Sequence, residues 1–213
     1  MITLHDYLPS QNGYKVRLLL SHLGRPYKTR HVRIFDGEGQ TPAFLKKNPT
    51  GAVPVLELED GRTLPESNAI LCYLADGSRY LPEQAWERAQ VVRWMFFEED
   101  FIQNGLASLR YWVMTGKVAR RSTDLVAQKR AVSTRSLAIL ERWLARREFV
   151  TDSGYTIADM SLFAYVDRME EAGLFMDDYP AISAWIDRVR AQPGFLDEPH
   201  PYSIDPSSEN ELP

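Results

Sequence analysis

A short segment around Pro54 constrains the fold more than any other part of the chain. Residues 48–56 read Asn-Pro-Thr-Gly-Ala-Val-Pro-Val-Leu, and Glu66 and Ser67 begin twelve residues after Pro54. This order predicts a turn, a strand that opens on a proline, a hairpin, and a helix whose first residues are polar. Proline lacks the backbone N–H that a central strand needs, and an X-Pro bond is where a cis peptide occurs. The sequence therefore predicts a sharp change of chain direction at Pro54, which leaves nearby backbone groups available to a ligand.

An extended peptide is the ligand that suits such a segment. It could lie along the Val53 backbone and pair with it as an added strand does. The helix after Glu66 and Ser67 would offer N–H groups and the positive end of its dipole to a carboxylate. We therefore expect a site for a small, extended, anionic peptide.

Composition and charge argue against several classes of partner. The chain has 213 residues, 44% hydrophobic and 25% charged, which is typical of a soluble globular protein. Its net charge of −4 argues against a nucleic-acid partner, because phosphate binding calls for a basic surface. No stretch approaches the ~20 apolar residues of a membrane helix. The single cysteine, Cys72, fits a reducing compartment, so we expect a cytoplasmic protein with no membrane partner.

Metal and cysteine chemistry are not expected. The four histidines, His5, His22, His31 and His200, have no metal-ligand spacing. Cys72 falls among apolar residues of a predicted helix, which favours a small buried residue over a nucleophile. No Cys-x-x-Cys pair exists, so disulfide reduction by the protein's own thiols is not predicted.

The periodicity of apolar residues divides the chain into two parts. Strands are predicted at 2–7, 27–34, 53–58 and 63–64, and helices at 12–23, from Thr41-Pro42, and at 67–74; Asp60-Gly61 signals a hairpin. Later segments are helical: 83–117 with a bend at Gly105, 123–147, a helix from Thr156 with Asp159 in a capping box, and one after Pro180. The pattern predicts an α/β domain over residues 1–76, a linker over 77–82 and an all-α domain over 83–213, whose last ten residues are loose.

Four motifs in this order resemble the cytosolic glutathione transferase family, in a bacterial, serine-type branch. They are residues 7–17, 48–56, 66–70 and 156–159, and residues 94–98 are similar to a helix of that branch. The resemblance implies a thioredoxin-like domain that binds glutathione and an all-helical domain that shapes the electrophile pocket. It also implies a homodimer with a role in detoxification. Glutathione would be the co-substrate of a small hydrophobic electrophile, with no tightly bound cofactor.

The resemblance also implies roles for residues that bind glutathione. Pro54 corresponds to the family's cis-proline, and the Val53 backbone to the group that pairs with the cysteinyl part of glutathione. Glu66 and Ser67 would hold the γ-glutamyl end. Ala52 is a departure, because family members often carry Gln, Lys, Arg or His there.

A missing side-chain contact at position 52 would weaken binding by about 1.5–3 kcal/mol. Gln40, Lys46 or Lys47 could compensate for it.

Three residues of the first loop could stabilise a glutathione thiolate. Ser10 is the first choice, because a hydroxyl donor and the end of the following helix would act together. Asn12 could donate from its amide and also suits a helix cap, and Tyr7 could offer a phenolic proton. Ser and Asn are also ordinary helix-capping residues, and Tyr7 could serve only in packing. Lys15 and Arg17 are expected to be surface or interdomain charges.

Aromatic residues on the long predicted helix could line the electrophile pocket. They are Phe97, Phe101, Tyr111 and Trp112, and core or dimer packing would explain them as well. Residues 101–105 depart from the His-Glu-Pro stretch of the related branch. Two alternatives therefore remain: a non-catalytic binding or scaffold protein with this fold, and a glutathione-dependent peroxidase or reductive dehalogenase.

Overall fold

The computed structural model describes all 213 residues, which form two compact units. Unit 1 comprises residues 1–76 together with 193–213, and unit 2 comprises residues 77–192. The chain thus divides differently from the expected ranges, because the C-terminal segment belongs with the first unit and not with the helices that precede it.

Unit 1 is built on a mixed sheet of four short strands, as the sequence predicts. The strands β1 (Thr3–Asp6), β2 (Lys28–His31), β3 (Val55–Glu57) and β4 (Thr63–Pro65) lie in the order β2-β1-β3-β4. β1 runs parallel to β2 and antiparallel to β3, and β3 and β4 form a hairpin. At its turn the Leu58 N–H bonds the Arg62 carbonyl at 2.8 Å, and Gly61 takes the left-handed φ of 84° that the Asp60-Gly61 signal predicts.

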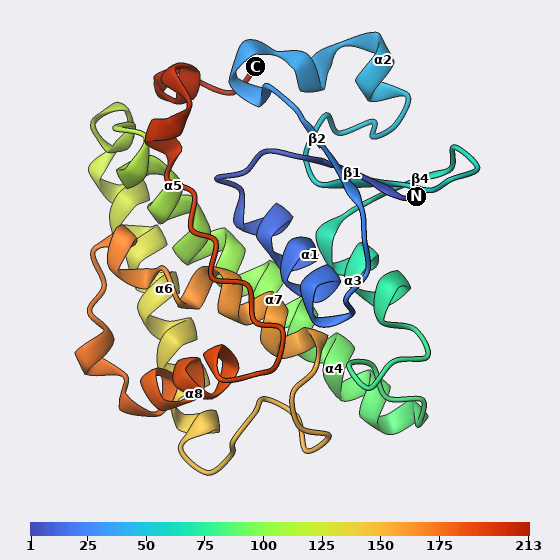
Figure 1. Cartoon of the computed structure of the whole chain (residues 1–213). Coiled ribbons are helices and arrows are strands. Elements are labelled where there is room, and N and C mark those ends of the chain that lie inside the picture. Colours follow the sequence, from blue (N-terminus) through green and yellow to red (C-terminus); the bar gives the residue numbers. More distant parts are fainter. The chain divides into compact units, whose positions relative to one another are not determined.

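Helices cover both faces of this sheet. The helices α1 (Gln11–His22) and α3 (Ser67–Ala75) pack against each other on one side, and α2 (Pro42–Leu45) lies on the other (Figure 1). α2 begins where predicted, because the Thr41 hydroxyl accepts the Phe44 N–H at 3.3 Å. Two 3₁₀ turns, η1 (Ile34–Asp36) and η2 (Glu38–Gln40), precede it.

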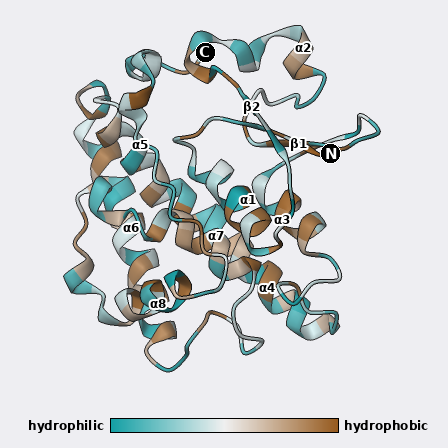
Figure 2. Ribbon diagram, in the orientation of Figure 1, coloured by the Kyte–Doolittle hydropathy of each residue, from teal (hydrophilic) through white to brown (hydrophobic).

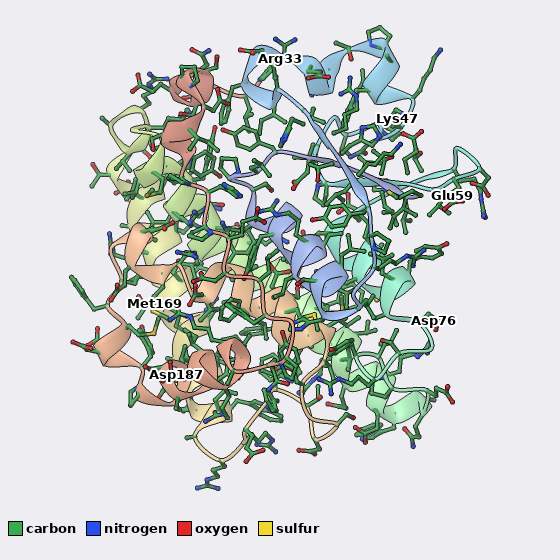
Figure 3. The ribbon with its side chains drawn as sticks, in the orientation of Figure 1. Arg33, Lys47, Glu59, Asp76, Met169 and Asp187 are labelled. Atoms are coloured by element: carbon green, nitrogen blue, oxygen red, sulfur yellow. The ribbon has the colours of Figure 1, made fainter.

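The face under α2 combines apolar packing with a polar cluster. Phe44 packs with Val32 and Val55, and the His5 ring lies 6.2 Å from its ring. Glu57 accepts from His5 Nε2 at 2.6 Å and from Lys47 Nζ at 2.7 Å (Lys47 is labelled in Figure 3). Burial lowers the pKa of His5, while the hydrogen bonds from Lys47 and His5 lower the pKa of Glu57. This histidine and this lysine therefore have structural partners within the sheet.

The C-terminal segment packs on unit 1 instead of being loose. The Tyr14 hydroxyl donates to the Leu196 carbonyl at 2.7 Å, and the Ser21 hydroxyl donates to the Gly194 carbonyl at 2.8 Å. Two 3₁₀ turns follow, η7 (Tyr202–Ile204) and η8 (Pro206–Glu209), and Ser208 is buried. The last ten residues, expected to be loose, therefore include an ordered turn, η8, with a buried Ser208, whereas residues 209–213 are all exposed.

Unit 2 is entirely helical, as predicted. It contains α4 (Ala85–Phe97), η3 (Glu98–Ala107), α5 (Ser108–Met114), α6 (Thr123–Leu144), α7 (Ile157–Val166) and α8 (Pro180–Arg190), with 3₁₀ turns η4 (Val118–Arg120), η5 (Met169–Ala172) and η6 (Met176–Asp178). Every residue of α7 is buried, and this helix contacts α4, η3 and α8. Unlike α7, the helix α8 carries both hydrophobic and hydrophilic residues (Figure 2). None of the helices combines the length and the apolar character that crossing a membrane requires.

A capping box starts α7, as the sequence predicts. The Asp159 carboxylate accepts the Thr156 N–H at 3.0 Å, and the Thr156 hydroxyl accepts the Ala158 N–H at 3.3 Å. The same carboxylate accepts the Val150 N–H and the Trp185 indole N–H, each at 3.0 Å. Burial raises the pKa of Asp159 to about 6, although these hydrogen bonds oppose the rise. One carboxylate thus joins α7, the segment before it and α8.

The long predicted helix over 83–117 contains a feature that its sequence did not suggest. Between α4 and α5 the chain forms a π-helix, η3, over ten residues that include Gly105. A Cβ on Gly105 would lie 3.0 Å from both the amide and the hydroxyl of Ser133 in α6. Gly105 therefore permits close contact between η3 and α6, where the sequence predicted a bend.

Candidate functional site

Ser10 is the N-cap of α1 and closes the loop after β1. Its N–H donates to the Tyr7 carbonyl at 2.8 Å, and its half-buried hydroxyl oxygen accepts the Gly13 N–H at 3.3 Å. Accepting this bond uses an oxygen lone pair and leaves the hydroxyl proton for donation. Ser10 can thus cap the helix and donate to an anion at the same time.

The first turn of α1 is linked to the start of α3. The Ser67 hydroxyl donates to Asn12 Oδ1 at 3.4 Å and accepts from Lys15 Nζ at 3.4 Å. Asn12 is half-buried, whereas Ser67 is buried and Lys15 fully so. The structure therefore brings two sequence-predicted residues, Asn12 and Ser67, into one polar network.

Tyr7 lies in an aromatic cluster. Its ring is buried, with ring centroids 5.6 Å from Phe35 in an edge-to-face arrangement and 6.1 Å from Tyr202. The Tyr7 ring thus packs among aromatic residues just after β1, while the Ser10 hydroxyl lies at the N-terminus of α1.

Lys15 and Arg17 are buried, so they are not the surface charges that the sequence analysis allowed for; Lys15 bonds Ser67, and Arg17 pairs with Asp6. Arg17 is paired with Asp6, a residue that sequence reasoning missed and whose carboxylate is fully buried. The sequence gives only a partial signal for the burial of α1: Leu18, Leu19 and Leu20 are consecutive, so apolar residues extend beyond one face of the helix. It does not identify Asp6 as the partner of Arg17.

The segment before β3 has the geometry that its sequence predicts. The Val53–Pro54 bond is cis, and the pairing of β3 with its neighbours begins only at Val55. Val53 is half-buried and its backbone stands outside that pairing. Ala52 is exposed, and its carbonyl accepts the Asn48 amide at 2.8 Å. The Val53 backbone therefore lies outside the paired part of the sheet.

Gln40 lies beside the position where Ala52 lacks a polar side chain. Gly51 has φ +72°, and a Cβ there would be 2.4 Å from Gln40 Nε2, so the Gln40 amide covers Gly51. Gln40 is exposed, as is Lys46, whereas Lys47 is bonded to Glu57. The Gln40 side chain thus lies beside Gly51, the residue before Ala52, whereas Lys47 already has a partner in Glu57.

Glu66 has a backbone conformation that is rare for a residue with a side chain. Its φ is +72° and it precedes Ser67, the first residue of α3. Such a residue is strained by about 1–3 kcal/mol, and conformations of this kind cluster at functional sites. Glu66 is exposed. Its carboxylate and the α3 N-terminus could therefore contact the amino and carboxylate groups of one amino-acid ligand.

The aromatic candidates on unit 2 fall into two groups. Phe97 and Phe101 are half-buried and form a pair with ring centroids 5.1 Å apart. Tyr111 and Trp112, also half-buried, each lie under a cation: Lys117 Nζ is 4.6 Å from the Tyr111 ring, and Arg121 Cζ is 5.4 Å from the Trp112 ring. The Phe97–Phe101 pair is thus the apolar surface among the four.

No group of three or more His, Cys, Asp or Glu side chains is arranged to hold a metal ion. Cys72 is half-buried on α3, so it is more exposed than the sequence predicts.

Comparison with known proteins agrees with this architecture. The chain matches the family models for the glutathione S-transferase N-terminal domain over residues 9–76 and C-terminal domain over residues 93–193. A glutathione S-transferase structure from Pseudomonas fluorescens is 38% identical, covers 92% of this chain and 98% of that chain, and has a TM-score of 0.89. The glutathione transferase URE2P6 of Phanerochaete chrysosporium, solved with oxidized glutathione, is 26% identical with a TM-score of 0.79, over 91% and 92% of the two chains. The disulfide-bond oxidoreductase YfcG of Escherichia coli is 26% identical over 91% of this chain and 92% of its own.

A mixed four-stranded unit with a cis-proline before β3, followed by an all-helical unit, is the glutathione transferase fold. The matches to both domain models and to a solved relative at 38% identity show that this chain belongs to the glutathione S-transferase family.

Proposed function

We propose that the protein binds glutathione, activates its thiol as the thiolate and joins it to a small hydrophobic electrophile. The observation that carries this proposal is the link between the two helix N-termini. Ser10 caps α1, and Asn12 in the same turn bonds Ser67 at the start of α3 at 3.4 Å. One donor group therefore stands close to one anion-binding group within unit 1, as a short peptide with a thiol and a carboxylate requires.

To activate the glutathione thiol, the site must stabilise the negative charge of the thiolate sulfur. A thiol with a pKa near 8.5 is mostly protonated at neutral pH, and a fall of two pKa units requires about 2.7 kcal/mol. A hydrogen bond from a hydroxyl to a charged group contributes about 1.5–3 kcal/mol. The N-terminus of α1 adds up to ~1 kcal/mol. Ser10 together with α1 is therefore sufficient, with Asn12 and Tyr7 as the alternative donors.

The rest of the peptide has complementary groups in unit 1. The Val53 backbone, beside Pro54, would pair with the cysteinyl residue as an added strand does. The γ-glutamyl carboxylate would lie at the N-terminus of α3, near the Ser67 hydroxyl, and Glu66 would accept from the amino group. Lys15 supports this arrangement, because its ammonium lies 3.4 Å from Ser67 Oγ.

The transfer step forms a carbon–sulfur bond. The thiolate sulfur donates an electron pair to an electrophilic carbon, which expels a leaving group or passes the electrons to an adjacent acceptor that then takes a proton. Phe97 and Phe101 are the proposed apolar contact for the electrophile, supported by their pairing and partial exposure. Glutathione serves as co-substrate, and this chemistry needs no tightly bound cofactor.

Calorimetry with glutathione tests the proposal directly. We expect micromolar to low-millimolar binding that weakens about tenfold or more in Ser67→Ala, because a charge-assisted hydrogen bond is lost. Ser10→Ala should bind glutathione nearly as well but should raise the pKa of its thiol. Ser122→Ala is the matched control, since Ser122 caps α6 in the same way, accepting the Leu125 N–H at 3.3 Å.

Absence of binding at millimolar glutathione would overturn the proposal and favour a non-catalytic protein of this fold. Binding without conjugation of any electrophile in a panel would instead favour a binding role or a different use of the thiolate.

Thiol–disulfide exchange is a second candidate, which the match to YfcG supports. The bound thiolate would attack a substrate disulfide to give a mixed disulfide and release one substrate thiol. A second glutathione would then release the other thiol and form oxidized glutathione. Turnover of a small disulfide with glutathione, compared with turnover of an aryl halide, distinguishes the two reactions.

We further propose that the protein is a cytoplasmic homodimer, a form that suits a role in detoxification. Two large aromatic side chains on α4 support self-association: Trp86 and Phe96 are each 66% exposed. The single cysteine fits a reducing compartment. Light scattering of the unaltered protein and of Trp86→Lys would test the dimer.

A further inference from the structure

A buried ion pair lies next to the loop that carries Ser10. Asp6, the last residue of β1, is fully buried, and Arg17 on α1 is 2% exposed. One guanidinium nitrogen, Nη1, pairs with Asp6 Oδ2. A third charge lies nearby, because Glu198 Oε2 is 3.7 Å from Arg17 Nε. Both charges of this pair are therefore removed from solvent.

Both members of the pair hold the backbone that leads to Ser10. Asp6 Oδ1 accepts the Tyr7 N–H at 2.8 Å. Arg17 Nη2 donates to the Leu8 carbonyl at 3.0 Å. The two residues that follow β1 are therefore each tied to the ion pair, one through an amide and the next through a carbonyl.

Gly13 connects the same pair to the Ser10 hydroxyl. A Cβ at position 13 would lie 1.8 Å from Asp6 Oδ1, so only glycine lets the first turn of α1 approach this carboxylate. The N–H of Gly13 is the group that Ser10 Oγ accepts, at 3.3 Å. Asp6 is thus connected to the Ser10 loop at two points: it bonds the Tyr7 N–H, and it packs against Gly13, whose N–H bonds Ser10 Oγ.

A contribution to the stability of the fold does not by itself explain why Asp6 and Arg17 form a buried ion pair. Removing two charges from water costs several kcal/mol, and well-packed apolar residues often replace a buried pair without loss. Arginine suits a positioning role, because its planar fork bonds two acceptors in fixed directions, which a lysine ammonium does not do. Here the two acceptors are the Asp6 carboxylate and the Leu8 carbonyl.

We propose that Asp6 and Arg17 are positioning residues for thiol activation: they hold residues 7–10 so that the Ser10 hydroxyl stays directed at the glutathione sulfur. The inference rests on the proposed function, because it assigns these residues to the same site. Neither touches glutathione, and both act through the loop and Gly13.

Arg17→Lys is the variant that tests this inference, because it keeps the charge and removes the fork. We expect faster amide hydrogen exchange over residues 7–14 without ligand. With glutathione, the pKa of its thiol should rise by about one unit, from about 6.5 to about 7.5, which lowers the thiolate fraction and kcat/KM at pH ~7 about threefold. The dissociation constant should change less than threefold, since the peptide is held by other residues. Arg30→Lys is the control, because Arg30 makes an exposed pair with Glu38 at 2.9 Å.

The outcomes separate the inference from the proposed function. Unchanged exchange over residues 7–14 in a folded Arg17→Lys protein would overturn the inference, whether or not glutathione binds. Faster exchange with an unchanged thiol pKa would also overturn it, since the loop would then be held for stability alone. A protein that does not bind glutathione would refute the proposed function, and the exchange data alone would then decide the positioning of the loop. If Arg17→Lys does not fold, Asp6→Asn provides the same two measurements.

Discussion

At the scale of single residues, the site depends on side chains that perform two tasks. Ser10 accepts the Gly13 N–H as a helix cap and retains a proton for an anion. Ser122 makes the same cap on α6. A comparison of the two serines therefore separates the energy of a cap, about 1 kcal/mol, from any contribution to the thiolate.

Gln40 gives a prediction of the same scale. Its amide covers Gly51, next to the exposed Ala52 that offers no polar side chain. We expect Gln40→Ala to weaken glutathione binding about three- to tenfold, because one hydrogen bond contributes ~0.5–1.5 kcal/mol. Calorimetry measures the change, and Gln128→Ala, an exposed glutamine of α6, is the control. Equal affinities of the two variants would show that Gln40 does not replace the missing side chain.

Features that depend on a few neighbouring residues in the sequence could be predicted. The cap at Thr41, the hairpin at Asp60-Gly61 and the turn before Pro54 each depend on a few neighbouring residues, and the structure has all three. The pair of Asp6 and Arg17 was not predicted, because it depends on which helix the fold buries.

At the scale of elements, α1 shows why burial was misjudged. Apolar Val16, Leu19 and Leu20 follow helical spacing, which predicted one buried and one solvated face. The structure buries Gly13 to Leu20 without interruption. The π-helix η3 was missed for a related reason, because an extra residue in a turn leaves no local composition signal when the helix continues on both sides.

The capping box of α7 gives a prediction at this scale. Asp159→Asn replaces one carboxylate oxygen by an N–H₂ group, so either Val150 and Trp185, which donate to Oδ1, or Thr156, which donates to Oδ2, lose their acceptor. We expect the free energy of unfolding to fall by about 2–3 kcal/mol, because a buried donor loses its acceptor. Urea unfolding followed by tryptophan fluorescence measures this change. Asp187→Asn on the exposed face of α8 is the control, labelled in Figure 3.

The same variant has a pH signature. The pKa of Asp159 is raised to about 6 in the folded protein, above its ordinary 3.8. Between these values the folded state binds the proton more strongly than the unfolded state, so this residue stabilises the fold increasingly as pH falls. The stability of the unaltered protein relative to Asp159→Asn should therefore be greater near pH ~4.5 than near pH ~7, by on the order of 1 kcal/mol. A difference of the opposite sign would mean that the hydrogen bonds outweigh burial and keep the carboxylate ionised.

At the scale of the whole molecule, the C-terminal segment that follows unit 2 belongs to unit 1. Sequence patterns suggested two successive domains, since a stretch rich in proline and acidic residues is typical of a loose tail. Yet residues 193–213 belong to unit 1. A few spaced contacts produce this arrangement, among them Tyr14 with Leu196 and Tyr202 with Tyr7, and no local periodicity marks them.

Two residues of the 3₁₀ turn η7 test whether the C-terminal segment stabilises unit 1. Tyr202 is 8% exposed and its ring lies 6.4 Å from Phe35, whereas Ile204 is 52% exposed. We expect Tyr202→Ala to lower the stability of unit 1 by about 2–3 kcal/mol, and Ile204→Ala to change it by less than ~0.5 kcal/mol. All five tryptophans lie within residues 77–192 and report on unit 2, so amide hydrogen exchange of β1 and α1 is the suitable measurement. Equal exchange in the two variants would mean that the C-terminal segment adds nothing to unit 1. Faster exchange in Tyr202→Ala alone would show that the first strand and helix of unit 1 are stabilised in part by residues at the far end of the chain.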